Sequence, residues 1–388
     1  MKALLPALAF TLCGTASSAA HAADPLHIRP GNFAYQPADP VEKGLWLEMD
    51  DAERQVRASK FLIDDPALNA YVKNVLCRTV GAEKCSAARI YLLRSPQFNA
   101  AMAPNGMMLV WSGLLLRVRN EAELAAVLGH EFVHFEQQHS LKSFRDMRAK
   151  SDAMAWLGFV PGGMLAQIGL MGSVFRFNRE MEKQADMTAL NYLSSNGYDP
   201  MAASQIWEQL LGEMVTQAKA GKTSVDATEG GDFFSSHPNT KDRMEYLRAA
   251  AKRKIPSGDK GIVRYKTALK IWWPKLLEDQ IKLNDFAATE YVLSGMARGN
   301  WSADLLYARG ELYRARGSAG DLVSAERFYR QSITIDPGQA DSWKGLGLVL
   351  LRQQQNAEGR RALRKYLELA PDAGDRALVA LMAEGATN

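Results

Sequence analysis

His130-Glu131-Phe132-Val133-His134 places two histidines four residues apart with a glutamate between them. On an α-helix such histidines lie on one face, one turn from each other, and can bind one zinc ion. Glu131 occupies an adjoining helical position, from which a carboxylate can take a proton from a zinc-bound water. The segment is therefore typical of a metallohydrolase.

The residues before this segment predict a helix. Asn120, followed three residues later by Glu123, is typical of a capping-box start. Apolar residues then recur near helical spacing at Leu124, Val127, Leu128, Phe132 and Val133. The alternative is a histidine pair held by hydrogen bonds inside an ordinary core, but this requires two costly polar burials with nothing to compensate them. We therefore expect the pair to bind a metal.

A catalytic zinc site needs a third protein ligand and one open position for water. Residues 178–186 predict a second helix, on which Glu182 and Asp186 lie one turn apart and share a face. We expect Glu182 to bind zinc and Asp186 to accept a hydrogen bond from the free ring N–H of a ligand histidine. Glu180 points elsewhere and is the weaker candidate. The alternative is an ordinary charged helix face.

Two further histidines need a role. His139 follows His134 by five residues, without the glycine and the six-residue spacing of the three-histidine zinc proteases. We expect it to cap the helix end or to support a ligand rather than to bind the metal. His237 lies in a Ser-His-Pro segment, with Arg243 six residues beyond it. The residues themselves leave the role of His237 open.

Four motifs in this order carry a family resemblance: Asn99 to Leu115, HEFVH at 130–134, Glu182 to Asp186, and Ser-His-Pro with Arg243. Together they resemble the family-forty-eight zinc metallopeptidases, of the HtpX and CAAX endopeptidase type, over about residues 40 to 250. The sequence departs from the commonest family pattern at Glu136, which is charged where a hydrophobic residue usually follows HExxH.

The resemblance implies a set of site residues. His130, His134 and Glu182 would be the zinc ligands, and Glu131 the catalytic base. It gives His237 one of two roles: a gate that occupies and blocks the fourth zinc position, or a donor that stabilises the developing oxyanion. Both roles remain open at this point.

Two apolar runs predict strands, at 89–94 and 107–111, joined through a Pro-Asn-Gly segment that favours a turn. An edge strand beside the zinc could pair with an extended substrate by β-augmentation, which depends little on substrate side chains. We therefore expect broad specificity for unfolded chains, whereas the alternative is a hairpin without substrate contact. The expected fold class is α+β, a mainly helical gluzincin-type domain with a small sheet.

Residues 1–22 are typical of a signal peptide: Lys2, an apolar run, then Ala20-His21-Ala22 as a small-x-small cleavage site. Cys13 lies in a poor lipobox, so we expect a soluble exported protein rather than a lipoprotein. In an oxidising compartment Cys77 and Cys85 are expected to form a disulfide, worth on the order of 2 to 3 kcal/mol. The alternative is two free buried thiols.

Residues 153–175 contain no charge and are long enough to span a bilayer. A single crossing would place His130 and Glu182 on opposite sides of the membrane, where they could not share one ion. Because Pro161-Gly162-Gly163 interrupts the run, we expect a buried apolar hairpin or lid near the active site, or else an element that touches the membrane.

The last third of the chain carries internal repeats. Two runs of residues match the tetratricopeptide pattern: Gly310, Tyr313, Ala325, Tyr329 and Pro337, then Trp343, Leu346, Gly347 and Pro371. The step from Pro337 to Pro371 is the expected 34-residue period, and a degenerate unit is expected at about 266–298. The predicted α-solenoid would present a concave surface for peptides or partner helices; the alternative is an unrelated helical bundle.

These observations predict a signal peptide at 1–22, a zinc peptidase domain at 23–262 and a tetratricopeptide-repeat domain at 263–388. The formal charge of +4, spread along the 388 residues, gives no nucleic-acid signature. We expect an endopeptidase with one zinc ion per chain, exported to a Gram-negative periplasm. The family resemblance suggests unfolded or misassembled proteins as substrates and outer-membrane-protein assembly machinery as a partner. The rival hypothesis is a tetratricopeptide chaperone or adaptor whose zinc site is structural or autoinhibited.

Overall fold

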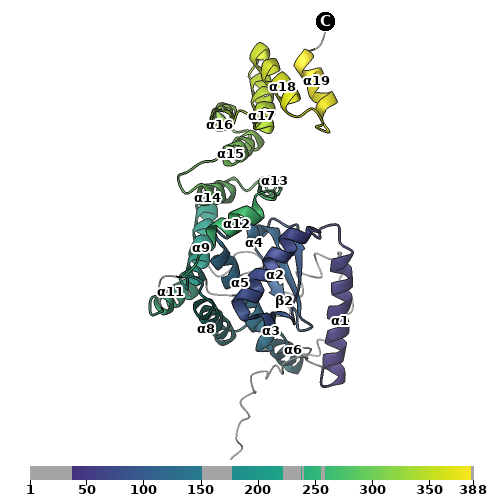
Figure 1. The fold of residues 1–388 in the computed structure, drawn as a ribbon, viewed down its shortest axis with the longest axis vertical. Coiled ribbons are helices and arrows are strands. Elements are labelled where there is room, and N and C mark those ends of the chain that lie inside the picture. Colours follow the sequence, from purple (N-terminus) through teal and green to yellow (C-terminus); the bar gives the residue numbers. More distant parts are fainter. Residues whose placement is uncertain (1–36, 151–176, 222–236, 238–239, 255–257, 386–388) are drawn as a thin grey trace, which may run out of the picture.

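The computed structural model describes residues 37–150, 177–221, 237, 240–254 and 258–385. Most of the described residues are helical, and a three-stranded sheet lies in the N-terminal part. Figure 1 shows the later helices stacked away from this sheet-containing part along the long axis of the molecule. This agrees with the α+β class expected from the sequence.

The sheet consists of β1 (Arg89–Leu93), β2 (Ala100–Met102) and β3 (Met107–Trp111), in the order β1-β3-β2. β1 runs parallel to β3, whereas β2 pairs with β3 as an antiparallel hairpin. The Pro-Asn-Gly turn therefore joins β2 to β3, and our expectation that it joins the two longer strands was wrong. A three-residue strand of small side chains is too short to produce a periodic signal.

Gly106 makes this turn possible. Its φ is +88°, and a Cβ at this position would lie 2.5 Å from the carbonyl oxygen of Ala87. The amide of Gly106 donates to Ala103, and the amide of Ala103 donates to Met107. Only glycine combines this left-handed backbone with so close an approach.

Alternate residues of β3 face two different cores, as expected for a strand buried on both sides. Met108 and Val110 contribute to the main core with α2 (Pro66–Val80) and α5 (Glu121–Glu136). Met107, Leu109 and Trp111 contribute to a smaller core with α1 (Pro40–Arg57) and α6 (His139–Lys150). The sheet is thus enclosed between α1 on one side and the metal-motif helix α5 on the other.

The predicted start of α5 is confirmed. The Asn120 side chain accepts a hydrogen bond from the Glu123 amide, and the Glu123 carboxylate accepts one from the Arg119 amide. Fifteen of the sixteen residues of α5 are buried, because this helix packs against α2, α8 (Arg179–Ser195) and α9 (Ala202–Gly221). The histidine pair therefore lies on a rigid central element.

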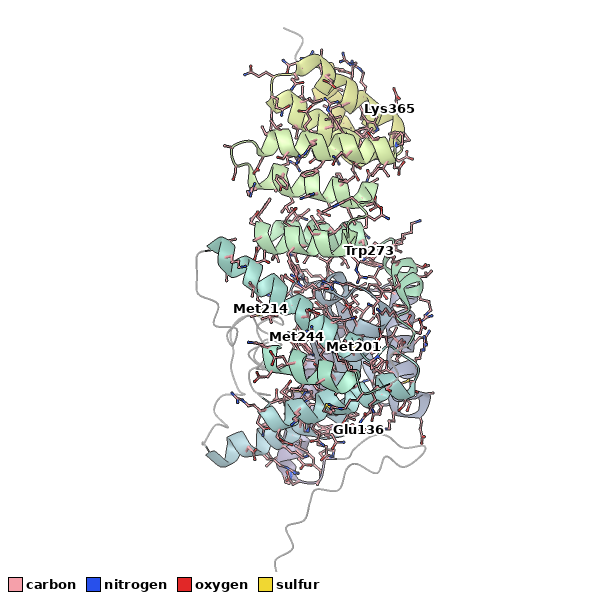
Figure 2. The ribbon with its side chains drawn as sticks, turned by 90° about the vertical axis from the view of Figure 1, so that its left-hand side faces the viewer. Glu136, Met201, Met214, Met244, Trp273 and Lys365 are labelled. Atoms are coloured by element: carbon pink, nitrogen blue, oxygen red, sulfur yellow. A yellow bond between two sulfur atoms is a disulfide. The ribbon has the colours of Figure 1, made fainter. Side chains whose placement is uncertain are left out.

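The first part contains four more described helices. They are α3 (Ala82–Cys85), α4 (Ser112–Arg117), α11 (Thr240–Ala251) and α12 (Ile262–Leu269). α9, which carries Met214 in Figure 2, packs against α11, which carries Met244. α11 also packs on α8, and His237, which precedes α11, lies beside His130 of α5.

The later helices pack mainly on their neighbours in sequence. They are α13 (Trp273–Lys282), α14 (Phe286–Ala297), α15 (Ala303–Arg316), α16 (Asp321–Ile335), α17 (Ala340–Arg352), α18 (Asn356–Leu369) and α19 (Arg376–Glu384). Gly310 and Gly345 lie against the ring of Tyr329, where a Cβ would come within 2.6 Å of ring carbons. Small residues thus permit close helix packing, as expected at Gly310; Gly345 was not among the residues matched to the repeat pattern.

Two expectations concern segments outside the described residues, namely the signal peptide at 1–22 and the apolar stretch at 153–175. Among the helices that the structure does describe, none combines the length and the apolar character needed to cross a bilayer. The sulfur atoms of Cys77 and Cys85 lie within bonding distance of each other, which is compatible with the expected disulfide.

Candidate metal centre

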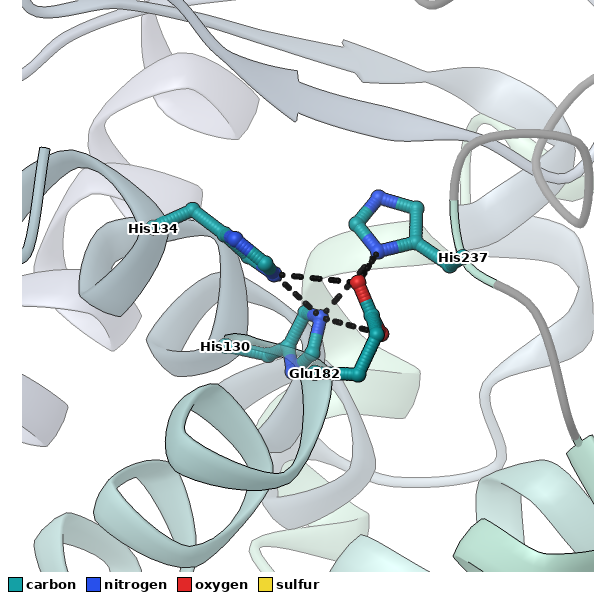
Figure 3. Close-up of side chains that lie close together, drawn as sticks. All are labelled: His130, His134, Glu182 and His237. Carbon is teal, nitrogen blue, oxygen red and sulfur yellow. Dashed lines mark hydrogen bonds and ion pairs between the residues drawn. The ribbon is translucent and has the colours of Figure 1, made fainter. Parts of the chain in front are cut away.

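Four side chains from three separate segments of the chain converge beside α5 (Figure 3). His130 and His134 come from consecutive turns of α5, and Glu182 comes from the first turn of α8. His237 belongs to the segment before α11. One ligand atom from each residue lies within 4.8 Å of the others, and all four residues are buried.

The distances inside this cluster are short. The Nε2 atoms of His130 and His134 lie 3.0 Å apart, and Nδ1 of His237 lies 2.8 Å from Glu182 Oε1. Glu182 Oε1 lies 3.5 Å from Nε2 of His134, and Glu182 Oε2 lies 3.6 Å from Nε2 of His130. Imidazole nitrogens and a carboxylate oxygen are the donors of catalytic zinc sites, so the residues fit a zinc ion.

Asp186 lies one turn beyond Glu182 and contacts His130 as expected. The Asp186 carboxylate lies 2.9 Å from Nδ1 of His130. Its pKa is low because the charge of Arg243 and the interaction with His130 outweigh the burial that would raise it. An ionised Asp186 accepts a hydrogen bond from Nδ1–H of His130 and leaves the lone pair of His130 Nε2 directed at the cluster.

Arg243 has a role that the sequence did not reveal. Its guanidinium donates to both Asp186 oxygens at 2.7 and 2.8 Å, and Nη1 lies 2.9 Å from Glu182. It also lies over the ring of Trp207, 3.9 Å from the centroid. Burial alone would raise the pKa of Glu182, but the charges of His237 and Arg243 lower it instead. Arg243 thus keeps Glu182 and Asp186 ionised.

Glu131 lies on the same helix and borders the cluster. One of its carboxylate oxygens is 3.6 Å from Nε2 of His237. Burial raises the pKa of Glu131 to about 8. A nearby cation would favour the ionised form, which is the form that a base requires.

The other candidates lie outside the cluster. His139 is not part of it, but its Nδ1 lies 3.0 Å from Nδ1 of His134. The side chain of Glu180 is exposed on α8. Glu136 is buried at the end of α5, where Lys84 and the hydroxyl of Tyr192 both donate to it at 2.5 Å. A paired charge thus replaces the hydrophobic residue expected there.

Comparison with known proteins agrees with this geometry. Residues 64–251 match peptidase family M48. This part of the chain is an M48 peptidase domain. It contains both metal-motif helices and His237, so the family expectation drawn from the four motifs is confirmed.

Three relatives illustrate the match. Mitochondrial metalloendopeptidase OMA1 of Schizosaccharomyces pombe is 31% identical over 182 residues, which are 46% of this chain and 51% of the relative. The beta-barrel assembly-enhancing protease of Escherichia coli K12 is 28% identical over 174 residues, covering 41% and 36%. That of Yersinia pestis is 26% identical over 222 residues, covering 50% and 45%. The chain thus spans about half or less of the length of these relatives.

Proposed function

We propose that this chain is a zinc-dependent endopeptidase. The observation that carries the proposal is the buried convergence of His130, His134 and Glu182 beside Glu131 in an M48 domain. A purely structural site has no use for a carboxylate at the position of Glu131. Relatives of both kinds, OMA1 and the beta-barrel assembly-enhancing proteases, are named as peptidases.

In the proposed mechanism His130, His134 and Glu182 hold the zinc ion. A bound zinc ion would polarise the scissile carbonyl and acidify a water molecule. Glu131 accepts the water proton and later passes it to the leaving amine. Asp186 orients His130 at 2.9 Å, and Arg243 holds Asp186 at 2.7 Å and Glu182 at 2.9 Å, so that both carboxylates stay ionised.

The proposed substrate class is argued from β2, a strand at the edge of the sheet. β2 is an outer strand of the sheet and contacts α5, the helix of the metal motif. The amide of Trp111 donates to Asn99 and that of Ala103 to Met107, so in an antiparallel pair the backbone groups of Ala100 and Met102 point away from β3. An extended substrate could pair there with little regard to its side chains. Unfolded or misassembled proteins are therefore the proposed substrates.

His237 is proposed to control the fourth ligand position. Its Nδ1 lies 2.8 Å from Glu182 and 3.4 Å from Nε2 of His130, which favours a gate that occupies the site. The alternative is that His237 moves aside during the reaction and donates to the oxyanion. If this gate stayed closed, the protein would not cleave substrates and would act only as a chaperone or adaptor, which is the rival hypothesis.

The later helices are proposed to form tetratricopeptide repeats that bind proteins. A groove of about 580 Å³ lies between α15, α16 and the loop before them, and is lined by Trp301, Leu306, Arg309, Arg327 and Phe328, among others. Among the described residues no acidic side chain lines this groove, although Arg309 is paired with Glu290 beside it. An acidic, partly apolar segment of a partner would complement this groove.

We place the protein in a Gram-negative periplasm, in the quality control of outer-membrane proteins. The signal-like residues 1–22 and the names of the beta-barrel assembly-enhancing relatives support this proposal. The outer-membrane-protein assembly machinery is the proposed partner of the later helices. Relatives named mitochondrial metalloendopeptidases support the chemistry but not the compartment.

The test compares purified protein with its Glu131→Gln variant on an unfolded protein substrate, with and without a chelator. We expect cleavage by the unaltered protein only, and equal zinc content in both proteins. A Glu131→Gln variant that cleaves normally would refute the role of Glu131. If neither protein cleaves but both suppress aggregation, the chaperone hypothesis is favoured.

A further inference from the structure

A chain of polar contacts extends from the metal centre through side chains that bind no metal. Nδ1 of His134 lies 3.0 Å from Nδ1 of His139. Nε2 of His139 lies 3.2 Å from Oε1 of Gln184. The amide nitrogen of Gln184 in turn donates to the side-chain oxygen of Gln137 at 3.1 Å. The chain thus connects the end of α5, the start of α6 and the first turns of α8.

The chemistry of these groups gives the contacts a direction. Because the Gln184 amide nitrogen donates to Gln137, its oxygen is the atom that faces His139. An amide oxygen only accepts, so Nε2 of His139 carries a proton and donates it. In a neutral imidazole the other nitrogen is then an acceptor. Nδ1 of His139 therefore accepts from Nδ1–H of His134.

The surroundings of His139 favour its neutral form. The residue is 1% exposed, and its hydrogen-bond partners are an imidazole and an amide, neither of which carries a negative charge that would compensate a buried cation. The ring of Phe177 stacks on His134 with the centroids 3.8 Å apart, and it also contacts His139 at a centroid distance of 6.2 Å. The two imidazoles are thus confined in rotation as well as in hydrogen bonding.

We infer that His139 and Gln184 are positioning residues that hold His134 as its Nδ1–H tautomer, with the lone pair of Nε2 directed at the metal position. The inference rests on the proposed function, because it assigns His134 as a zinc ligand. It gives the two ligand histidines different supports: an anionic carboxylate, Asp186, behind His130 and a neutral imidazole and amide behind His134.

The difference between these supports has a chemical consequence. Asp186 adds a negative charge near the centre, whereas His139 and Gln184 fix geometry without adding charge. Supporting hydrogen bonds of this kind typically change metal affinity by 10-fold to 100-fold. Loss of the acceptor at His139 would leave His134 free to adopt the other tautomer, in which Nε2 carries a proton and cannot bind zinc.

Zinc affinity, measured by competition with a chelator, provides the first test. His139→Leu should bind zinc 10-fold to 100-fold more weakly than the unaltered protein. His139→Asn, whose side-chain oxygen can accept at the position of Nδ1, should retain affinity within a few-fold. Ser140→Ala removes a neighbouring buried hydroxyl from α6 and is the matched control. Equal affinity in a folded His139→Leu variant would overturn the inference.

The second test locates the proton directly. In zinc-loaded protein labelled with ¹⁵N-histidine, an N–H···N hydrogen bond between His134 and His139 produces a scalar coupling between their Nδ1 nuclei. We expect this coupling, with the proton on His134. A proton on Nδ1 of His139 would overturn the inference even if the protein cleaves substrates. If the protein binds zinc and shows the expected coupling between the two Nδ1 nuclei but cleaves no substrate, the proposed function is refuted and the inference about His139 stands.

Discussion

The charged residues around the metal centre depend on one another. Arg243 lies between Glu182 and Asp186, and all three side chains are almost completely buried. Breaking such a group by removing one partner leaves an uncompensated buried charge. The site is therefore both the proposed reaction centre and a structural link between α8 and α11.

Replacing Arg243 with methionine should lower the free energy of unfolding by about 3 to 5 kcal/mol, because it leaves two buried carboxylates without their cation. Chemical denaturation measures this change. Arg248→Met is the matched control on the same helix: its ion pair with Glu208 is exposed, so its loss should cost less than about 1 kcal/mol. Equal losses in the two variants would contradict the proposed role of Arg243.

Replacing His237 with alanine separates its two proposed roles. A gate that contacts Glu182 and His130 would be removed, so initial rates of substrate cleavage should rise. If His237 instead donates to the oxyanion, the same substitution should lower the rate, with kcat affected more than KM. Zinc content should be preserved in either case. Unchanged kinetics would remove both roles.

For individual residues, the sequence predicted those contacts that follow from the spacing of residues along one helix. His130 with His134, and Glu182 with Asp186, are pairs one turn apart; the structure brings His130, His134 and Glu182 into one cluster and places Asp186 against His130. The contacts of Arg243 with Glu182, and of His139 with Gln184, join different helices. Their partners depend on how α5, α6, α8 and α11 pack, and no local spacing encodes this packing.

Helix α1 contacts the sheet through polar side chains as well as through apolar core residues. Glu53 on α1 accepts two hydrogen bonds from Arg89 of β1, at 2.6 and 2.7 Å, and one from Tyr91. Burial alone would raise the pKa of Glu53, but the hydrogen bonds from Arg89, Tyr91 and Arg57 outweigh it and lower the pKa to about 2. α1 is thus tied to β1 by a buried charge.

This contact predicts a pH dependence of stability. Because the pKa of Glu53 is lower in the folded state than its ordinary value of 4.5, its contribution is present above pH 4.5 and is lost as the pH falls towards 2. Glu53→Gln should therefore lower the unfolding free energy by about 2 kcal/mol at neutral pH, and the difference should shrink in acid.

Denaturation measured from pH 7 down to pH 2.5 checks this expectation. Glu48→Gln, at an exposed position of the same helix, serves as the control and should show almost no difference at any pH. A constant difference between Glu53→Gln and the unaltered protein across the whole range would contradict the assigned ionisation.

The pairing of the strands could not be predicted from sequence patterns alone. β1 and β3 were predicted, at 89–94 and 107–111, because both are mainly apolar runs of strand length; β1 ends one residue earlier, at Leu93. Their parallel pairing was not predicted, because it joins segments that are separated by β2 and a turn. β2 offers three small or flexible side chains, Ala100, Ala101 and Met102. It forms a strand because β3 supplies hydrogen-bonding partners, not because of its own periodicity.

The whole molecule combines the M48 part with a stack of later helices. The two are joined by a buried polar contact as well as by chain continuity: Arg117 of α4, which donates to Glu213 of α9 at 2.7 Å, also donates to Gln280 of α13 at 3.2 Å. A substrate or partner held by the later helices would therefore be connected to the sheet edge through packed elements. The repeat pattern predicted helices there, whereas their attachment to α4 and α9 could only come from the structure.

The central claim is that a histidine pair and one distant carboxylate share a single metal ion. The most direct measurement is the zinc content of purified protein and of its Glu182→Ala variant, by elemental analysis after removal of loosely bound metal. We predict one zinc ion per chain in the unaltered protein, and loss of both zinc and cleavage in the variant. Folded protein without a divalent ion, or a Glu182→Ala variant with full zinc content and full cleavage, would contradict the claim.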